Sequence, residues 1–278
     1  MYQPVIPVSG IGGWRFLQAT YDRQLASHSE NPQVRADRNY LIGKLSEPIT
    51  TEDFLNDKRL LRIAMTAFDL GGEEWKRGFI SKALTEAADP TSTWLARLNN
   101  SKYTAFASMF ASATGEIKLS EAKVQELAAA YNTAAFELSV GEVDESMRLA
   151  LNFQSELPKL IGTGTNETAM LYRILGDVPV RTVLEKATGL PESMRKLPIE
   201  KQAEMLKAAM QRTFGIDKVS DLTAADKMDK AVQRYHAVQS VQSANYGTSG
   251  AANALVLLGG SGSGLGPQAS LNLLLSNR

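Results

Sequence analysis

Apolar residues recur at intervals of three or four along almost the whole chain, as on one face of an α-helix. This spacing predicts helices at about residues 10–28, 33–45 and 120–139, the last of them ended by Gly141. Alternating runs of β-branched and aromatic residues between turn residues, the usual sign of strands, are scarce. The pattern therefore predicts an all-α protein, a multi-helix bundle.

One helical pattern occurs twice, from Phe54 to Leu70 and, 120 residues further on without a gap, from Ile174 to Leu190. The two copies share four identical positions, Leu55/Leu175, Asp57/Asp177, Ala67/Ala187 and Leu70/Leu190. Their apolar positions have helical spacing, and aspartate is a favoured residue at the start of a helix. The repeat predicts two loosely repeated helix-turn-helix units, in which the aspartates cap helices. After the first unit, Trp75, Phe79 and Leu84 predict the apolar face of another helix.

Composition divides the chain into a body and a tail. Residues 1–243 form the predicted helical body, with two lobes and a hinge near the Gly-Thr-Gly-Thr segment at residues 162–165. Residues 244–278 are rich in Gly and Ser and predict a flexible tail. Apolar segments in such a tail typically dock on a partner or on the same chain. The predicted partner-binding residues are Leu255, Val256, Leu257, Leu258, Leu271, Leu273, Leu274 and Leu275.

Charge and cysteine content narrow the classes of partner. Thirty Lys and Arg residues balance thirty Asp and Glu residues, and no basic run is present, so we expect no nucleic-acid partner. No stretch of about 18 apolar residues exists, so we expect no membrane span. The absence of cysteine excludes disulfides and thiolate chemistry, and fits either a reducing cytosol or export. The first nine residues lack the basic and apolar regions of a cleaved secretory signal.

Motifs for bound cofactors or metals are lacking. The Gly-rich segment at residues 259–266 has neither the register nor the lysine of a phosphate-binding loop. The two histidines, His28 and His236, do not form a His-Glu-x-x-His motif, and we expect them to be solvated or at the edge of the core. We therefore predict no cofactor, no metal and no catalytic residue, and a protein that is not an enzyme.

Carboxylates are the remaining candidates for chemistry. We interpret Asp57 and Asp177 as helix caps, and Asp144 as the ion-pair partner of Arg148 one turn further on. A helical enzyme with a carboxylate-based site is an alternative. It would require a deep pocket in which Asp57 or Asp177 faces inward beside an unpaired arginine.

Four segments together resemble a known family. They are residues 4–17, which begin Pro-Val-Ile-Pro-Val-Ser-Gly, and residues 57–62, 141–151 and 188–191. In this order and spacing the chain, to about Phe214, resembles an alphaproteobacterial family known as domain of unknown function 1217. Members of that family often lie in flagellar gene clusters. The resemblance implies a motility setting and transfers no catalytic residue.

From the residues and the resemblance together we expect a non-enzymatic structural or assembly protein of the bacterial flagellum. It would act through protein–protein contacts with other flagellar or export proteins, or by self-association. It would lie in the flagellum, or be exported without a cleaved signal. The alternatives are a cytoplasmic export chaperone or regulator of flagellar assembly, and the carboxylate-based enzyme.

Overall fold

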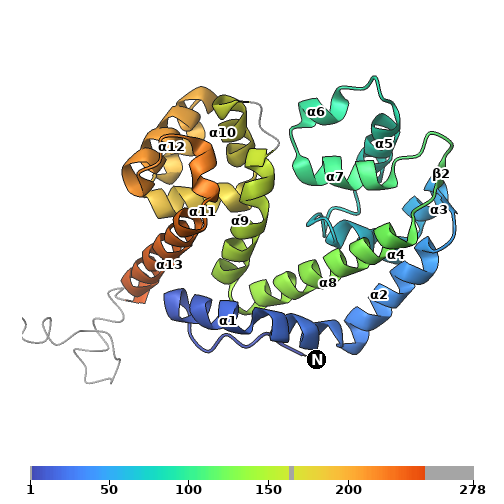
Figure 1. The fold of residues 1–278 in the computed structure, drawn as a ribbon, viewed down its shortest axis with the longest axis horizontal. Helices are drawn as coiled ribbons and strands as arrows, with labels where there is room; N and C mark the ends of the chain where they lie inside the picture. Colours follow the sequence, from blue (N-terminus) through green and yellow to red (C-terminus); the bar gives the residue numbers. More distant parts are fainter. Residues whose placement is uncertain (1, 163–165, 248–278) are drawn as a thin grey trace, which may run out of the picture.

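The computed structural model describes residues 2–162 and 166–247. Within these residues thirteen α-helices and two short 3-10 helices accompany one two-stranded antiparallel sheet (Figure 1). The prediction of an all-α protein is therefore confirmed. The helices form two lobes with separate hydrophobic cores, and the long helix α8 (Glu121–Val143) runs from one lobe into the other.

The N-terminal lobe has a core rich in aromatic residues. Phe54 and Phe110 are stacked with their ring centroids 4.6 Å apart, and Phe106 lies 5.1 Å from Phe110. Besides the first part of α8, the lobe contains α2 (Pro32–Leu45), β1 (Ile49–Thr50), α3 (Thr51–Asn56), α4 (Lys58–Thr66), α5 (Arg77–Ala88), α6 (Trp94–Leu98), α7 (Ser101–Phe110) and β2 (Glu116–Ile117). The two strands pair antiparallel, with Ile49 opposite Ile117.

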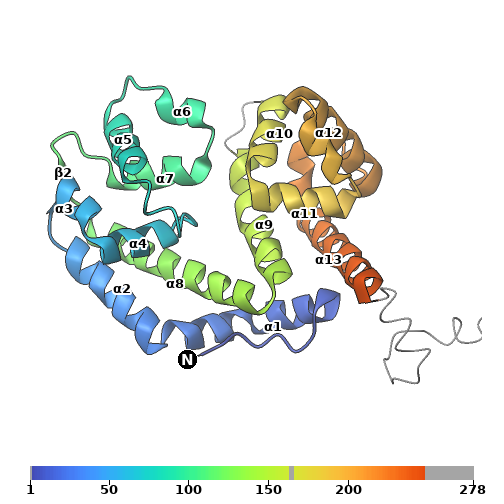
Figure 2. The ribbon, with the colours of Figure 1, turned by 180° about the vertical axis from the view of Figure 1, so that it is seen from behind.

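The C-terminal lobe has a mainly aliphatic core, built around α11 (Val178–Thr188), which packs against its neighbours on two sides. These neighbours are α9 (Glu145–Gly162) and α13 (Ala225–Gly247), and Figure 2 shows all three from behind. The other elements of the lobe are α10 (Glu167–Gly176), η1 (Glu192–Lys196), α12 (Ile199–Phe214) and η2 (Val219–Thr223).

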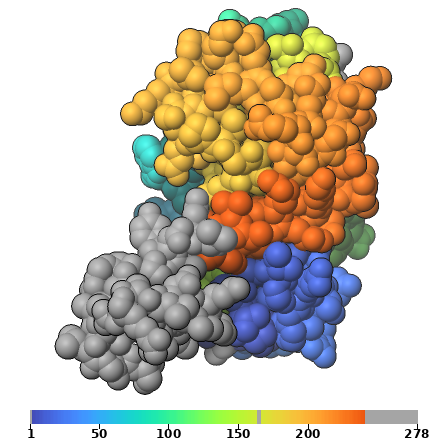
Figure 3. Space-filling model, turned by 90° about the vertical axis from the view of Figure 1, so that its left-hand side faces the viewer, coloured from blue at the N-terminus to red at the C-terminus, as the bar shows by residue number. Residues whose placement is uncertain are grey.

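Helix α1 (Gly10–Ser29) lies across the base of both lobes (Figures 1 and 2). Trp14 and Leu17 are buried in the C-terminal core, and α1 packs against α8 and α13. Figure 3 shows α13 held between α1 and the rest of the C-terminal lobe. The extended arm before α1 folds back on it, because the Gln24 side chain hydrogen-bonds both the amide and the carbonyl of Val5. This contact holds the arm against α1.

The predicted repeat is confirmed as two helix-turn-helix units, α3–α4 and α10–α11. Each aspartate ends one helix and caps the next. Asp57 accepts the Leu60 amide at 2.9 Å, and Asp177 accepts the Val180 amide at 3.0 Å. The φ and ψ angles are also close, −76° and 91° for Asp57 and −89° and 106° for Asp177. The same local sequence therefore builds the same helix corner in both lobes.

Three predicted boundaries differ from the structure. The two cores do not divide at residues 162–165, because α9 and α10 on either side of that segment belong to the same core. Helix α8 contributes its first part to the N-terminal core and its last part to the C-terminal core. Gly141, the predicted end of this helix, lies inside it. Helix α8 continues to Val143, where Asp144 stops it by accepting the Ser146 amide at the start of α9. The last helix also continues past residue 243, to Gly247.

Candidate functional site

Two adjoining hollows lie where the lobes face one another. The first, of about 440 Å³, is lined by residues of α7, α8 and α9. The second, of about 370 Å³, is lined by the turn after α4, by α7 and by the α10–α11 corner. Asp69 and Lys102 line both hollows. We call the combined feature the interlobe cleft, and it is the candidate site because polar groups from both lobes converge on it.

Lys102 connects the lobes at the centre of the cleft. Its Nζ lies 3.2 Å from Asp69 Oδ2 in the N-terminal lobe and 4.0 Å from Asp177 Oδ2 in the C-terminal lobe. Asn152 of α9 donates a second hydrogen bond to Asp69 from its buried side chain. Asp69 has a φ of 58°, a left-handed conformation that aspartate tolerates better than most residues. That turn presents the carboxylate to both partners at once.

Glu137 of α8 is the most strongly perturbed acid in the cleft. Burial raises its pKa to about 7, and the neighbouring charge of Asp69 adds to this, while the hydrogen bond from the Tyr21 hydroxyl acts in the opposite direction. Glu156 lines the same hollow and is bound by Lys159 at 2.7 Å. Glu137 therefore keeps its proton to a higher pH than an ordinary glutamate does.

This arrangement has two chemical possibilities. A carboxyl group with a pKa near neutrality can act as a general base or acid. The cleft can also receive a polar or charged side chain of another protein. Among residues 2–162 and 166–247, no group of three or more His, Cys, Asp or Glu side chains has the arrangement of a metal site.

The structure separates the two predicted aspartates. Asp177 lines the interlobe cleft, whereas Asp57 faces Tyr40 and Lys44 on α2. The arginines that line the cleft with Asp177 are Arg148 and Arg173, and neither is free. Arg148 makes two hydrogen bonds to Glu145, at 2.9 and 2.7 Å. The enzyme alternative required an inward aspartate beside an unpaired arginine. The cleft has the aspartate, Asp177, but its two arginines are paired.

Two further sequence predictions have clear outcomes, and a third falls outside the described residues. The predicted Asp144–Arg148 ion pair is wrong, because Arg148 binds Glu145 while Asp144 caps the start of α9. The histidines are not solvated, since His28 and His236 are 5% and 0% exposed. The predicted partner-binding residues of the tail, 255–258, 271 and 273–275, lie outside the described residues.

The sequence did not point to Asp69, Lys102 or Glu137, because each acquires its role from residues distant in the chain. Trp75 was misplaced as part of a helix face. It precedes α5, and its side chain is 77% exposed. The Gly71-Gly72 pair could have indicated that Trp75 lies outside a helix, since residues after a glycine-rich turn need not continue the helical pattern.

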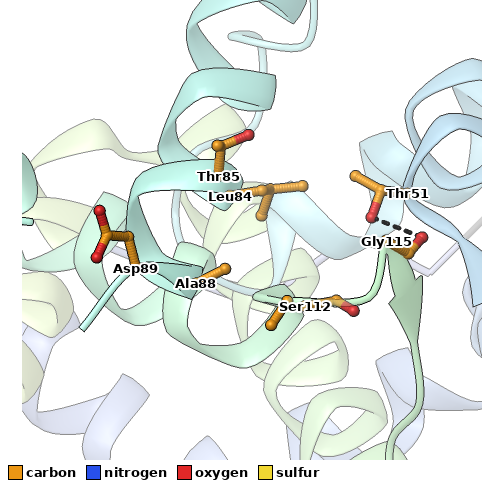
Figure 4. Close-up of a pocket in the computed structure, with 8 residues that line it drawn as sticks. Thr51, Leu84, Thr85, Ala88, Asp89, Ser112 and Gly115 are labelled. Carbon is orange, nitrogen blue, oxygen red and sulfur yellow. Dashed lines mark hydrogen bonds between the residues drawn. The ribbon is translucent and has the colours of Figure 1, made fainter. Parts of the chain in front are cut away.

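A further hollow, of about 390 Å³, lies between the end of α5 and the segment that leads into β2 (Figure 4). Thr51 closes one side by donating its hydroxyl to the Gly115 carbonyl at 3.1 Å. The ionisable side chain in its lining, Asp89, points away from Thr51 and Ser112 and accepts hydrogen bonds from Thr91. This hollow offers no converging reactive groups, so the interlobe cleft remains the candidate site.

The fold and the cleft define a two-lobed helical protein whose lobes repeat one helix corner. The sequence profile of the family described as protein of unknown function (DUF1217) matches residues 67–228, so the chain belongs to that family. The matched segment includes Asp69, Lys102 and Asp177 of the cleft.

One solved structure is similar across nearly the whole chain. It is the X-ray crystal structure of a protein from Agrobacterium tumefaciens, determined by a structural genomics consortium. The two chains are 22% identical and superpose with a TM-score of 0.66, over 87% of this chain and 99% of the other. At this identity the similarity shows the fold alone. No protein of curated function matches the sequence. None of the described helices is long and apolar enough to cross a membrane.

Proposed function

We propose that this protein is a non-enzymatic component or assembly factor of the bacterial flagellum that acts by binding other proteins. The observation that carries the protein-binding part is Trp75, whose indole is 77% exposed on the connection between α4 and α5. Tryptophan is enriched among the residues that dominate protein–protein interfaces, because its large ring buries much apolar area on binding.

A second exposed apolar residue supports the same function. Val178 is 67% exposed and lines the interlobe cleft beside Asp177. The charged groups at the centre of the cleft already engage one another, as Lys102 does with Asp69 and Asp177. This pairing gives the cleft a defined shape and charge pattern for a partner surface. The flagellar setting is supported by the resemblance of the sequence to its family.

The proposal is tested by locating the protein in the native bacterium. Hook–filament preparations would be isolated from wild-type cells and from cells with a disabled flagellar export apparatus, and the protein quantified by immunoblotting. We expect it in the wild-type preparation and its loss from the extracellular fraction of the export-defective cells. Protein found only in the cytosol of both strains would contradict a structural role outside the cell. A cytosolic complex with one export substrate would then favour the chaperone alternative.

Glu137 favours a second candidate, the carboxylate-based enzyme. Its pKa near 7 and its place in a hollow of about 440 Å³ are the features of a general base. A hydrolase screen would compare the wild type with Glu137→Gln and with the control Glu126→Gln, an exposed residue of the same hollow. Activity lost only in Glu137→Gln would support the enzyme. Activity that is absent, or equal in all three proteins, would contradict it.

A further inference from the structure

A small hollow opens beside the exposed indole of Trp75. Its volume is about 280 Å³, and Leu61, which is 1% exposed, forms its apolar floor. We call it the Trp75 hollow, and its lining residues are Lys58, Leu61, Arg62, Glu74, Trp75 and Arg77. The buried leucine at the bottom and the exposed indole at the side form a binding site for one apolar side chain.

The rim of the Trp75 hollow is basic. Three of its six lining residues are cations and one is an acid. The acid, Glu74, already accepts a hydrogen bond from the Gly72 amide at 3.1 Å. Lys76, whose Nζ lies 5.5 Å from the centre of the Trp75 ring, is paired with Glu73 at 2.8 Å and adds no net charge. The whole chain has as many acids as bases, so this excess of positive charge is local.

Arg62 is partly neutralised, because it binds the buried Asp37 at 2.7 Å. Arg59 binds the same carboxylate at 2.8 Å, so two arginines share one acid and a net positive charge remains. Burial would raise the pKa of Asp37, but the hydrogen bonds from Arg62 and Arg59 outweigh burial and hold the pKa below its usual value. Arg62 is thereby fixed in place at the edge of the hollow.

The other two cations each begin a helix, but only one of these helices lacks an acidic cap. Lys58 is the first residue of α4, and Arg77 is the first residue of α5. The N-terminus of a helix carries a partial positive charge and is stabilised by acids, not by cations. At α4 the Asp57 carboxylate caps the helix beside Lys58, so the preference is met there. Helix α5 has neither a side-chain cap nor an acid in its first turn, so Arg77 departs from the preference and leaves positive charge at the hollow.

We propose that the Trp75 hollow binds an acidic segment of a partner protein, which places one apolar side chain between Leu61 and Trp75. The inference rests on the proposed protein-binding function and names the chemistry of the partner. The cations and the uncapped N-terminus of α5 attract the acidic groups, and the indole and leucine bury the apolar one. Residues 248–278 of this chain contain no Asp or Glu, so they do not match the surface.

The test uses the full chain and three fluorescein-labelled peptides of about twelve residues. The first alternates Glu and Ser around a central Leu, the second replaces that Leu by Ser, and the third replaces every Glu by Lys. Fluorescence anisotropy would be measured at low and at high salt. We expect the first peptide to bind most tightly, and its affinity to fall as salt rises. Equal binding of the first and third peptides, or no binding of the first, would overturn the proposal.

Substitutions then locate the binding. We expect Trp75→Ala to weaken binding of the first peptide by about tenfold or more, and Lys58→Glu and Arg77→Glu to do the same at low salt. The charge reversals place acids at helix N-termini, so they do not destabilise the fold by that route. Arg212→Glu on α12 is the matched control, an exposed arginine with the same change of charge, and binding should be unchanged. Equal weakening by Arg212→Glu would overturn the assignment to this hollow.

Nucleic acid is the principal competing ligand for an indole among cations. A labelled single-stranded oligonucleotide would be titrated in the same assay. Oligonucleotide binding that is tighter than peptide binding and equally sensitive to Trp75→Ala would overturn the proposal in favour of nucleic acid. The fractionation of flagella remains a separate outcome. If the protein is absent from flagella but binds the peptide, only the flagellar setting is contradicted. If the protein is present in flagella but does not bind the peptide, only the assignment of this surface is contradicted.

Discussion

The two helix-turn-helix units have the same capped helix corner in two different surroundings. Asp57 and Asp177 cap their helices with the same geometry, but their pKa values move in opposite directions. Burial would raise the pKa of Asp57, but the bonds from the Leu60 amide and the Tyr40 hydroxyl outweigh it and hold the pKa below its usual value. Burial raises the pKa of Asp177 at the cleft, and the Val180 amide offsets only part of that rise.

The comparison separates what the local sequence decides from what the lobes decide. The cap depends on the aspartate and the next three residues, which both copies supply. The pKa of the aspartate depends on its surroundings in the fold. Tyr40 and Lys44 of α2 help to lower the pKa of Asp57, whereas burial raises the pKa of Asp177 and Lys102 of α7 offsets only part of that rise. The corner of the N-terminal unit therefore lies among the side chains of α2 that pair with Asp57, and the corner of the C-terminal unit lines the interlobe cleft. A repeated structural element can serve folding in one lobe and contribute to a site in the other.

The largest effect should come from the matched core positions Phe54 and Ile174, both 0% exposed. Phe54→Ala removes a ring stacked on Phe110 and should lower the free energy of unfolding by about 4 kcal/mol. Ile174→Ala should lower it by about 3 kcal/mol. Urea unfolding followed by far-UV circular dichroism measures both. Losses below about 1 kcal/mol at either position would mean that the unit is not part of that lobe's core.

Acid should weaken the C-terminal lobe through His236 of α13. Both ring nitrogens lack hydrogen-bond partners, and burial lowers the pKa of His236 from 6.5 to about 4, although the charge of Asp144 acts in the opposite direction. Because the folded pKa is below the unfolded one, stability is complete above pH 6.5 and is lost as the pH falls towards 4. The loss should reach about 3 kcal/mol.

His236→Phe isolates this contribution, because Phe keeps the ring that lies 5.5 Å from the Trp14 ring. Glu137 acts oppositely over part of this pH range, since its raised pKa stabilises the fold as it becomes protonated, but it is present in both proteins. The free-energy difference between variant and wild type should therefore move in favour of the variant as pH falls from 7 to 4.5. A difference that does not change with pH would contradict the assignment.

The smallest effect should come from the two caps. Asparagine caps helices well, so the exchange of Asp for Asn mainly removes the charge. Asp57→Asn should cost about 1 kcal/mol at pH 7, and this cost should vanish at acidic pH, because the lowered pKa gives stability that is lost as pH falls. Asp177→Asn should be neutral or stabilising at pH 7, because its raised pKa makes ionisation unfavourable. Equal losses of stability in the two variants at pH 7 would contradict the proposed difference between Asp57 and Asp177.

The local parts of this structure could be predicted from the sequence. Apolar spacing and capping residues identified most helices, and the repeat identified the corners at Asp57 and Asp177. The exposure of Trp75 and the contact of Lys102 with both lobes could not be predicted, because they depend on how elements far apart in the chain pack. The place where one core gives way to the other could not be predicted for the same reason. Gly and Thr at residues 162–165 indicate a break in a helix, but they do not indicate which core its two sides join.

The central claim, that the exposed surface at Trp75 binds an acidic partner protein, can be tested directly in living cells. A photo-crosslinking amino acid would replace Glu74, which lines the Trp75 hollow, in the native bacterium, with Arg212 replaced in a control strain, and the crosslinked products would be identified by mass spectrometry. We predict one dominant product from position 74 that is absent from the control, joined through an acidic segment of a flagellar or export protein. The same products from both positions, or a product joined through a basic segment or nucleic acid, would contradict the claim.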